Sequence, residues 1–292
     1  MEDTEHLLEK YEQAFQGIPA FDGTCDIGEV KTKEHLEKVF SCIDLTTLNT
    51  GDSANSVQEF CDKVVSFHRD YPDMPLVAAV CTYPVFASVL KARLRDLDVG
   101  RAVVSAGFPS SQTFLDVKTM ETRKALEMGA NEIDVVISAG EFLEGNYEFV
   151  MEEISNIKSV TKDNHLKVIL ETGILSSPEN IWDASIIAME AGADFIKTST
   201  GKTSPAATPE ALWTMAHAVK AFHAQTGKAV GLKPAGGIST SDDALVYYCL
   251  VKDVLGDEWL TPSRFRIGAS RLANHLLEDM AELGGPDTGP RF

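Results

Sequence analysis

Two lysines stand at the carboxyl ends of short apolar segments in this chain of 292 residues. Lys197 ends the segment 193–197, which reads Ala-Asp-Phe-Ile-Lys, and Lys233 ends the segment 230–233, which reads Val-Gly-Leu-Lys. A buried ammonium group is costly unless it loses its proton or gains a partner, and a second ammonium nearby lowers its pKa further. A lysine that is neutral near pH 7 is an amine nucleophile that forms a Schiff base with a carbonyl substrate. The pair therefore predicts carbonyl chemistry, provided that the fold brings the two lysines together.

Eight short apolar, β-branched segments alternate with segments whose apolar residues have helical spacing. Ser177 and Thr208 each precede a proline at an expected helix start, and Gly129 and Gly192 stand where helices should end. Eight strands alternating with helices over about 250 residues predict the α/β class and a (β/α)8 TIM barrel, the alternative being an open doubly wound sheet. The expected strands are residues 41–45, 76–81, 102–105, 132–137, 167–171, 194–198, 229–233 and 265–268.

The two ends of the chain are expected to lie outside the barrel. Residues 1–40 are polar with helical character, and we expect them to form an N-terminal helical extension that covers the bottom of the barrel. Residues 41–280 are expected to form a single TIM-barrel catalytic domain, and residues 281–292 a C-terminal tail. No linker, low-complexity tract or change of composition marks a second domain.

An internal repeat predicts that a carboxylate joins the two lysines. Residues 127–134 and 190–197 both run from a helix end through Gly-Ala and an amide or acid into a strand. Asp134 and Lys197 therefore take the same offset on the fourth and sixth strands, and alternate strands of such a barrel share one layer of inward side chains. Lys233 ends the neighbouring seventh strand. We expect one acid and two lysines at one mouth of the barrel.

This cluster suits chemistry through an imine. Either lysine can be the nucleophile, with the other as a charged neighbour that lowers its pKa, and Asp134 can move protons. The alternative is that Lys197 and Asp134 form an inert buried ion pair, which the presence of Lys233 weakens. Gly231 lies two residues before Lys233 on the same face, and it is expected to leave space in the barrel.

Glycines after the last strands predict a phosphate site. The loops after strands seven and eight, with a helix N-terminus, are where barrels of this kind often bind phosphate, because glycine lets backbone N–H groups approach the anion. A Gly-Gly pair taken alone would be a plain turn, whereas its place after a lysine-ended strand favours phosphate. The expected phosphate-binding residues are Gly201, Lys202, Gly236, Gly237, Gly268 and Ser270.

Other polar residues near strand ends have less definite roles. Asp44 ends the first expected strand, where it can accept hydrogen bonds from substrate hydroxyls or serve as a loop or N-cap acid. Cys81 ends the second and is by default a small buried apolar residue, although at the mouth it can meet electrophiles. Glu171 ends the fifth, and its role is open. Lys167 begins the fifth strand at the bottom face and is expected to be structural.

Composition limits the classes of partner. The chain has 26 Lys and Arg against 44 Asp and Glu, a net charge of −18, so nucleic acid and anionic membranes are poor partners and an anionic substrate needs a locally positive site. Five cysteines without a CxxC pattern or signal peptide predict a reduced, cytoplasmic protein. No apolar stretch approaches the roughly 20 residues of a membrane span. The scattered histidines predict no metal site, and we expect no cofactor.

With these motifs the chain resembles the deoxyribose-phosphate aldolases, a family of class I aldolases that use a Schiff base and no metal. The resemblance runs from about Ser41 to Leu277. It implies reversible cleavage of 2-deoxy-D-ribose 5-phosphate to acetaldehyde and D-glyceraldehyde 3-phosphate. The segments that carry it are residues 44–49, 132–136, 167–173, 193–202, 233–237 and 265–270.

The resemblance also implies residue roles. By motif match Lys197 forms the imine, Lys233 is its electrostatic partner, and Asp134 transfers protons with a bound water. Asp44 and Thr46 match positions near the hydroxyl end of the substrate. Substrate-binding residues are therefore expected to be Asp44, Thr46, Cys81 and Thr200, and the phosphate end matches Lys202, Gly236, Gly237, Gly268 and Ser270. The expected partners are sugar phosphates and aldehydes, and the family suggests a homodimer.

The chain departs from the family pattern at three places. Ser239 stands where many relatives have an arginine after the Gly-Gly pair, and Arg271 stands where they often have a second small hydroxyl residue. We expect a cation to have moved from one phosphate loop to the other. Some relatives end in a tyrosine that assists proton transfer, but Phe292 has no hydroxyl. Two alternatives remain open: a Schiff-base lyase for another sugar phosphate, and a non-catalytic sugar-phosphate-binding protein.

Overall fold

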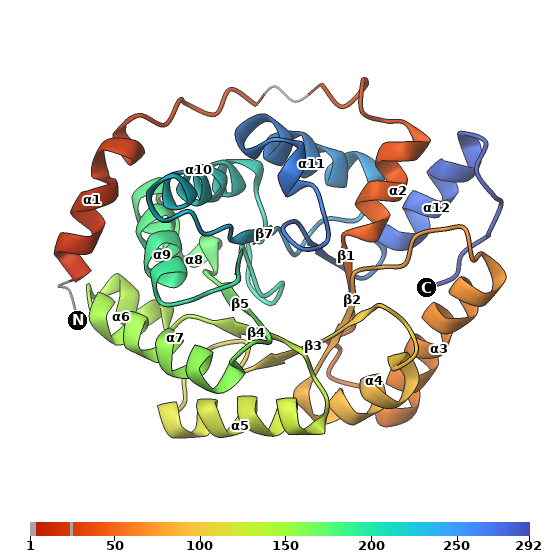
Figure 1. Cartoon of the computed structure of the whole chain (residues 1–292), viewed down its shortest axis with the longest axis horizontal. Helices are drawn as coiled ribbons and strands as arrows, with labels where there is room; N and C mark the ends of the chain where they lie inside the picture. The colour runs from red at the N-terminus through yellow and green to blue at the C-terminus, as the bar shows by residue number, and fades with distance from the viewer. Residues whose placement is uncertain (1–3, 24–25) are drawn as a thin grey trace.

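Eight parallel strands form a closed barrel in the computed structural model, which describes residues 4–23 and 26–292 (Figure 1). Their order is β7-β6-β5-β4-β3-β2-β1-β8, and bridges from Leu232 to Phe265 and from Ala235 to Gly268 join β7 to β8. These bridges exclude the open sheet, so the predicted TIM barrel is confirmed. The strands are β1 Ile43–Thr46, β2 Ala79–Thr82, β3 Gly100–Ser105, β4 Glu132–Val136, β5 His165–Ile169, β6 Phe195–Lys197, β7 Gly231–Lys233 and β8 Ile267–Ala269.

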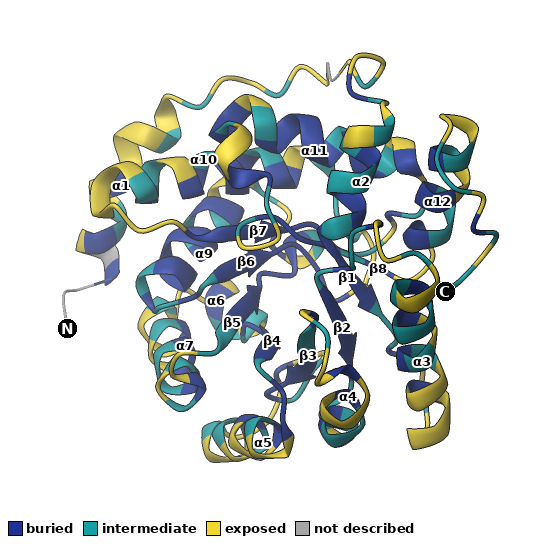
Figure 2. Cartoon of the chain, turned by 45° about the vertical axis from the view of Figure 1, so that its right-hand side comes forward, coloured by how far each residue is buried: buried dark blue, intermediate teal, exposed yellow. Residues whose placement is uncertain are grey.

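Helices surround the barrel, and their buried faces pack on strands that are mostly buried (Figure 2). The predicted caps are confirmed, since the hydroxyls of Ser177 and Thr208 accept hydrogen bonds from backbone N–H groups and Gly129 ends its helix in the left-handed conformation. The long helices are α3 Ala54–Asp70, α4 Ala87–Leu94, α5 Leu115–Met128, α7 Tyr147–Thr161, α9 Pro178–Glu190, α10 Pro209–Thr226, α11 Ser241–Leu255 and α12 Leu272–Glu282. Shorter helices are α6 Ala139–Leu143 and α8 Thr172–Leu175, with single 3-10 turns at Pro84–Phe86 and Asp257–Trp259.

The N-terminal residues contain two helices, α1 Thr4–Gln16 and α2 Lys33–Ser41. Figure 1 shows α1 outside α9 and α10, and α2 beside α11 and α12. The Phe15 ring lies 5.4 Å from Trp182, and the Tyr11 hydroxyl donates to Glu190 at 2.7 Å. The expectation that this extension covers the barrel bottom is wrong, because the apolar face of α1 packs on the outer helices. A cavity of about 740 Å³ opens at the bottom instead.

The C-terminal tail packs on the outside of the helix ring. The Phe292 ring lies 6.1 Å from Phe40 and 5.4 Å from Phe67, and its backbone N–H donates to Asn274 Oδ1 at 3.0 Å. The exact division into extension, domain and tail stays a prediction. In the described part of the chain, no helix has both the length and the apolar character that crossing a membrane requires. Of the five cysteines, Cys25 lies outside the described residues and the other four are buried.

Candidate active site

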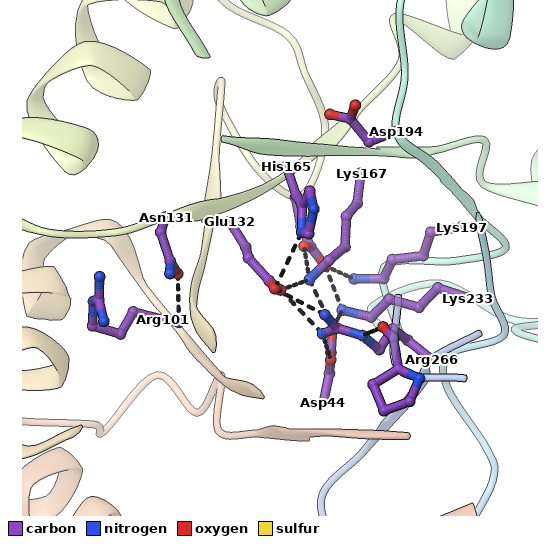
Figure 3. Close-up of polar contacts among 12 residues, drawn as sticks. Asp44, Arg101, Asn131, Glu132, His165, Lys167, Asp194, Lys197, Lys233 and Arg266 are labelled. Atoms are coloured by element: carbon purple, nitrogen blue, oxygen red, sulfur yellow. Dashed lines mark hydrogen bonds and ion pairs between the residues drawn. The ribbon is translucent and has the colours of Figure 1, made fainter. Parts of the chain in front are cut away.

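The side chains of Lys197 and Lys233 lie close together inside the barrel (Figure 3), and both bind the carboxylate of Asp134. Lys197 and Lys233 are direct neighbours in the register of β6 and β7. The Nζ atom of Lys197 lies 2.8 Å from Asp134 Oδ2, and the Nζ atom of Lys233 lies 2.7 Å from the same oxygen. The predicted convergence of one acid and two lysines is therefore what the barrel geometry produces.

Lys167 lies directly below this group. Its Nζ atom is 2.8 Å from Asp44 Oδ2, 2.5 Å from Glu132 Oε2 and 3.3 Å from Asp134 Oδ1, and its side chain has no exposure. The expectation that Lys167 begins its strand at the bottom face is wrong, because β5 begins two residues earlier, at His165. Because side chains alternate with a period of two, a strand that starts two residues earlier still points Lys167 into the barrel. The earlier start places Lys167 in the middle of the barrel and not at its rim.

Arg266 closes the cluster at the bottom. Its guanidinium donates to Asp44 Oδ1 at 2.6 Å and to Glu132 Oε1 at 2.9 Å. Sequence reasoning gave no role to Glu132 or Arg266. The signal that was available is charge in apolar segments, since Glu132 lies two residues before Asp134 on the same face and Arg266 directly precedes β8.

The net charge of the buried cluster depends on whether Lys197 is protonated. If every group is ionised, three carboxylates face four cations, so the cluster carries one excess positive charge. If Lys197 is neutral, the cluster is balanced, and an uncompensated buried charge is what a low-dielectric interior disfavours most. The carboxylates are Asp44, Glu132 and Asp134, and the cations are Lys167, Lys197, Lys233 and Arg266.

The pKa values of Lys197 and Lys233 are shifted in opposite directions. Burial lowers the pKa of Lys197, the positive charge of Lys233 lowers it further, and Asp134 only partly opposes this. Burial also acts on Lys233, but the attraction of Asp134 and Asp44 outweighs it and raises the pKa of that lysine. Burial alone would raise the pKa of Asp134, yet the surrounding lysines hold it below its usual range. Lys197 is therefore the lysine most easily deprotonated, beside a carboxylate that stays ionised.

A cavity of about 270 Å³ lies above the cluster at the carboxyl ends of the strands. Lys197 lines it and keeps 4% exposure, whereas Lys233 has none and does not line it. All six expected phosphate residues line this cavity, as do Thr46, Thr200, Ser239 and Arg271. Gly236 must be glycine, because its φ is +89° and a Cβ atom there would lie 2.8 Å from the Cβ of Ala206.

Two expected substrate residues lie below the cavity. Both carboxylate oxygens of Asp44 bind cations, and the residue has no exposure. Cys81 is fully buried against Ala79, Ala102 and Val104, and burial raises the pKa of its thiol to about 11. Neither lines the cavity, so contact of either residue with a substrate stays a prediction that this geometry does not support.

The space expected beside Gly231 is filled. A Cβ atom at Gly231 would lie 2.2 Å from the ring of Phe195, which stands opposite it in the register of β6 and β7. Glycine at this position therefore accommodates an aromatic ring inside the barrel, and it leaves no room for a substrate.

Replacing Lys167 by methionine is expected to lower the free energy of unfolding by about 3–5 kcal/mol, because it removes the buried cation that Asp44, Glu132 and Asp134 share. Urea denaturation at pH 7 measures the change. Lys220→Met, on the exposed face of α10, is the control and should leave the free energy of unfolding nearly unchanged. Equal stabilities of the two variants would show that the Lys167 ion pairs contribute nothing.

Comparison with known proteins identifies the family of this barrel. Residues 38–250 match the model of the DeoC/LacD family aldolases, so the chain belongs to this family. It is 43% identical to a deoxyribose-phosphate aldolase of Bos taurus over 247 residues, covering 81% of this chain and 78% of that protein. It is 42% identical to the Homo sapiens deoxyribose-phosphate aldolase over 251 residues, covering 82% and 79%.

The fold agrees with a solved structure. A tetrameric deoxyribose phosphate aldolase from Aeropyrum pernix superposes with a TM-score of 0.66 at 24% identity, covering 94% of this chain and 97% of that one. This likeness concerns the fold alone. The family model and the two relatives confirm the family resemblance predicted from the motifs.

Proposed function

We propose that this chain is a class I aldolase that reversibly cleaves 2-deoxy-D-ribose 5-phosphate to acetaldehyde and D-glyceraldehyde 3-phosphate, in the breakdown of deoxyribose phosphates. The observation that carries the proposal is the placement of Lys197. Lys197 lines the cavity, whereas Lys233 does not. The Nζ atom of Lys197 lies 2.8 Å from Asp134 Oδ2, and the pKa of this lysine is lowered. Lys197 is therefore the imine-forming residue, and Lys233 is its fully buried electrostatic partner.

The mechanism begins with attack by neutral Lys197 on the C1 aldehyde of the open-chain sugar. The carbinolamine loses water and gives a protonated imine, which is the electron sink. A base takes the proton of the C3 hydroxyl, the C2–C3 bond breaks, and its electrons form an enamine on Lys197 while C3 becomes the new aldehyde. Protonation of the enamine at C2 and hydrolysis of the imine release acetaldehyde and restore the amine.

Asp134 is suited to the proton path through a water. Its Oδ2 atom binds both Lys197 and Lys233. Its buried Oδ1 atom has only the ion-pair contact with Lys167 at 3.3 Å and accepts no hydrogen bond from the described residues. A buried carboxylate oxygen without a hydrogen bond is costly, so a bound water is the natural donor. Because the lysines keep the pKa of Asp134 low, the carboxylate orders this water and passes the proton on without retaining it.

The other end of the cavity suits a phosphate. Lys202 and Arg271 bring positive charge, and Gly236 and Gly237 have positive φ angles that open their backbone to an anion. Ser239 and Arg271 line the same cavity. This supports the view that Arg271 supplies the cation that Ser239 lacks. On a chain of net charge −18 such a local positive site is what an anionic substrate requires.

Borohydride trapping with acetaldehyde, followed by peptide mass mapping, tests the proposal. We expect addition on Lys197, because an imine formed there is reduced to a stable secondary amine. Addition on Lys233 would exchange the roles of the two lysines. No addition to a folded sample that binds sugar phosphate would favour the non-catalytic binding protein, and a panel of sugar phosphates separates this aldolase from a lyase with another substrate. Cytoplasmic location and a homodimer stay predictions.

A further inference from the structure

Glu171 has an unusual backbone conformation directly above the barrel. It follows β5 after one residue, and its φ and ψ angles of 57° and 58° place it in the left-handed region, which a residue with a side chain rarely adopts. Strain of this kind persists only where the surrounding contacts enforce it, and it concentrates at functional sites. The contacts of the Glu171 side chain are therefore the place to look for its role.

Both carboxylate oxygens of Glu171 bind one residue of the loop after β6. Oε1 accepts a hydrogen bond from the backbone N–H of Thr200 at 3.1 Å, and Oε2 accepts one from the Thr200 hydroxyl at 2.6 Å. Glu171 is 3% exposed and Thr200 is 6% exposed, so both bonds are shielded from water. Hydrogen bonds to an ionised acceptor are about twice as strong as neutral ones, which makes this a firm attachment.

The hydrogen bonds of Glu171 extend through Thr200 to Lys202, at the expected phosphate end of the cavity. The Thr200 hydroxyl that donates to Glu171 also accepts the backbone N–H of Lys202 at 3.0 Å. Gly201 lies between them with a φ of +74°, and the turn packs on Gly236, where an added Cβ would lie 3.2 Å from the Gly201 Cα. Thr200, Gly201 and Lys202 all line the cavity, so the Glu171 carboxylate determines where this wall stands.

The residues that follow Glu171 hold the rest of the same loop. The backbone N–H of Thr172 donates to the Thr198 carbonyl at 2.9 Å. A Cβ at Gly173 would lie 2.1 Å from the carbonyl oxygen of Pro205, so the two backbones are in close contact. Residues 201–205 are otherwise exposed. An exposed loop that must present a cation in one geometry needs such an anchor.

We propose that Glu171 is a positioning residue for phosphate recognition: through Thr200 it holds the Thr200–Lys202 turn so that Lys202 and the loop N–H groups face the phosphate. The inference rests on the proposed function and deepens it. Glu171 touches no substrate itself. It acts on the selectivity for a phosphorylated over an unphosphorylated sugar, and it leaves imine formation on Lys197 intact.

The test compares kinetics on 2-deoxyribose 5-phosphate and on 2-deoxyribose for Glu171→Ala, Thr200→Val and Thr200→Ser. For Glu171→Ala and Thr200→Val we expect KM for the phosphorylated sugar to rise and the ratio of the two kcat/KM values to fall by about tenfold, the effect of one or two charge-assisted hydrogen bonds. Thr200→Ser retains the hydroxyl and should keep the ratio near that of the parent. Glu144→Gln is the matched control and should not change this ratio, because Glu144 is an exposed carboxylate that does not line the cavity of Lys197.

Two outcomes would overturn the inference. Equal losses on both sugars would mean that Glu171 only supports the fold, and an unchanged ratio in Thr200→Val would mean that the attachment does not position the loop. If Glu171→Ala does not fold, Thr200→Val still decides, because it leaves Glu171 in place. Acetaldehyde trapping on Lys197 in the parent protein tests the proposed aldolase function separately from the role of Glu171. If trapping fails, the aldolase function is contradicted and the positioning role is not.

Discussion

Replacing Lys197 by alanine is expected to abolish cleavage of 2-deoxyribose 5-phosphate, with kcat reduced by at least about 10⁴-fold. Among the described residues, Lys197 is the one lysine that both contacts Asp134 and lines the cavity. Lys233 does not line the cavity, and Asp134 and Asp44 raise its pKa. It therefore offers neither access nor a neutral amine. The measurement is the rate of aldehyde release together with the loss of borohydride-trapped acetaldehyde.

The fold should survive this substitution. Removing Lys197 leaves three carboxylates facing Lys167, Lys233 and Arg266, so the buried charges remain balanced. We expect circular dichroism and the unfolding midpoint to stay close to those of the parent. Lys220→Ala, on the exposed face of α10, controls for loss of a lysine as such and should retain full activity. Substantial turnover by Lys197→Ala would contradict the assignment of the nucleophile.

The convergence of Asp134 and Lys197 could be predicted from sequence because it depends on local repetition. Each residue lies at the same offset from the glycine that ends the preceding helix, and the barrel repeats this unit with a constant geometry. Lys233 could be added because it ends the next strand. The glycine loops could be placed for the same reason, since strand ends in a barrel all reach the same face.

The lower half of the cluster could not be predicted, because charged residues in apolar segments do not say which partners they meet. Arg266, before β8, reaches Glu132 of β4 across the barrel. Lys167 of β5 meets Glu132 on the neighbouring strand. The height of Lys167 depended on where β5 begins, which hydrophobic pattern alone places only to within a few residues. The position of α1 likewise depended on which surface its apolar face would meet.

Replacing Lys233 by leucine is expected to shift the acid limb of the kcat/KM profile to higher pH and to lower activity at pH 7 by at least about 100-fold. The reason is charge balance. Without Lys233 the cluster with a neutral Lys197 has one excess negative charge, so a proton on Lys197 becomes favourable. The positive neighbour that helps to lower the pKa of Lys197 is also gone, and both effects raise that pKa.

The sign follows from the active form of the nucleophile. Lys197 must be neutral to attack, so activity appears as pH rises through its pKa, and a higher pKa moves that rise toward alkaline pH. Lys202→Leu is the matched control, because Lys202 is a cation that lines the cavity but donates to the Leu48 carbonyl and not to Asp134. We expect Lys202→Leu to raise KM for the phosphorylated sugar without shifting the acid limb of the kcat/KM profile. An unshifted limb in a folded Lys233→Leu would remove the electrostatic role of Lys233, and the low pKa of Lys197 would then have to come from burial alone.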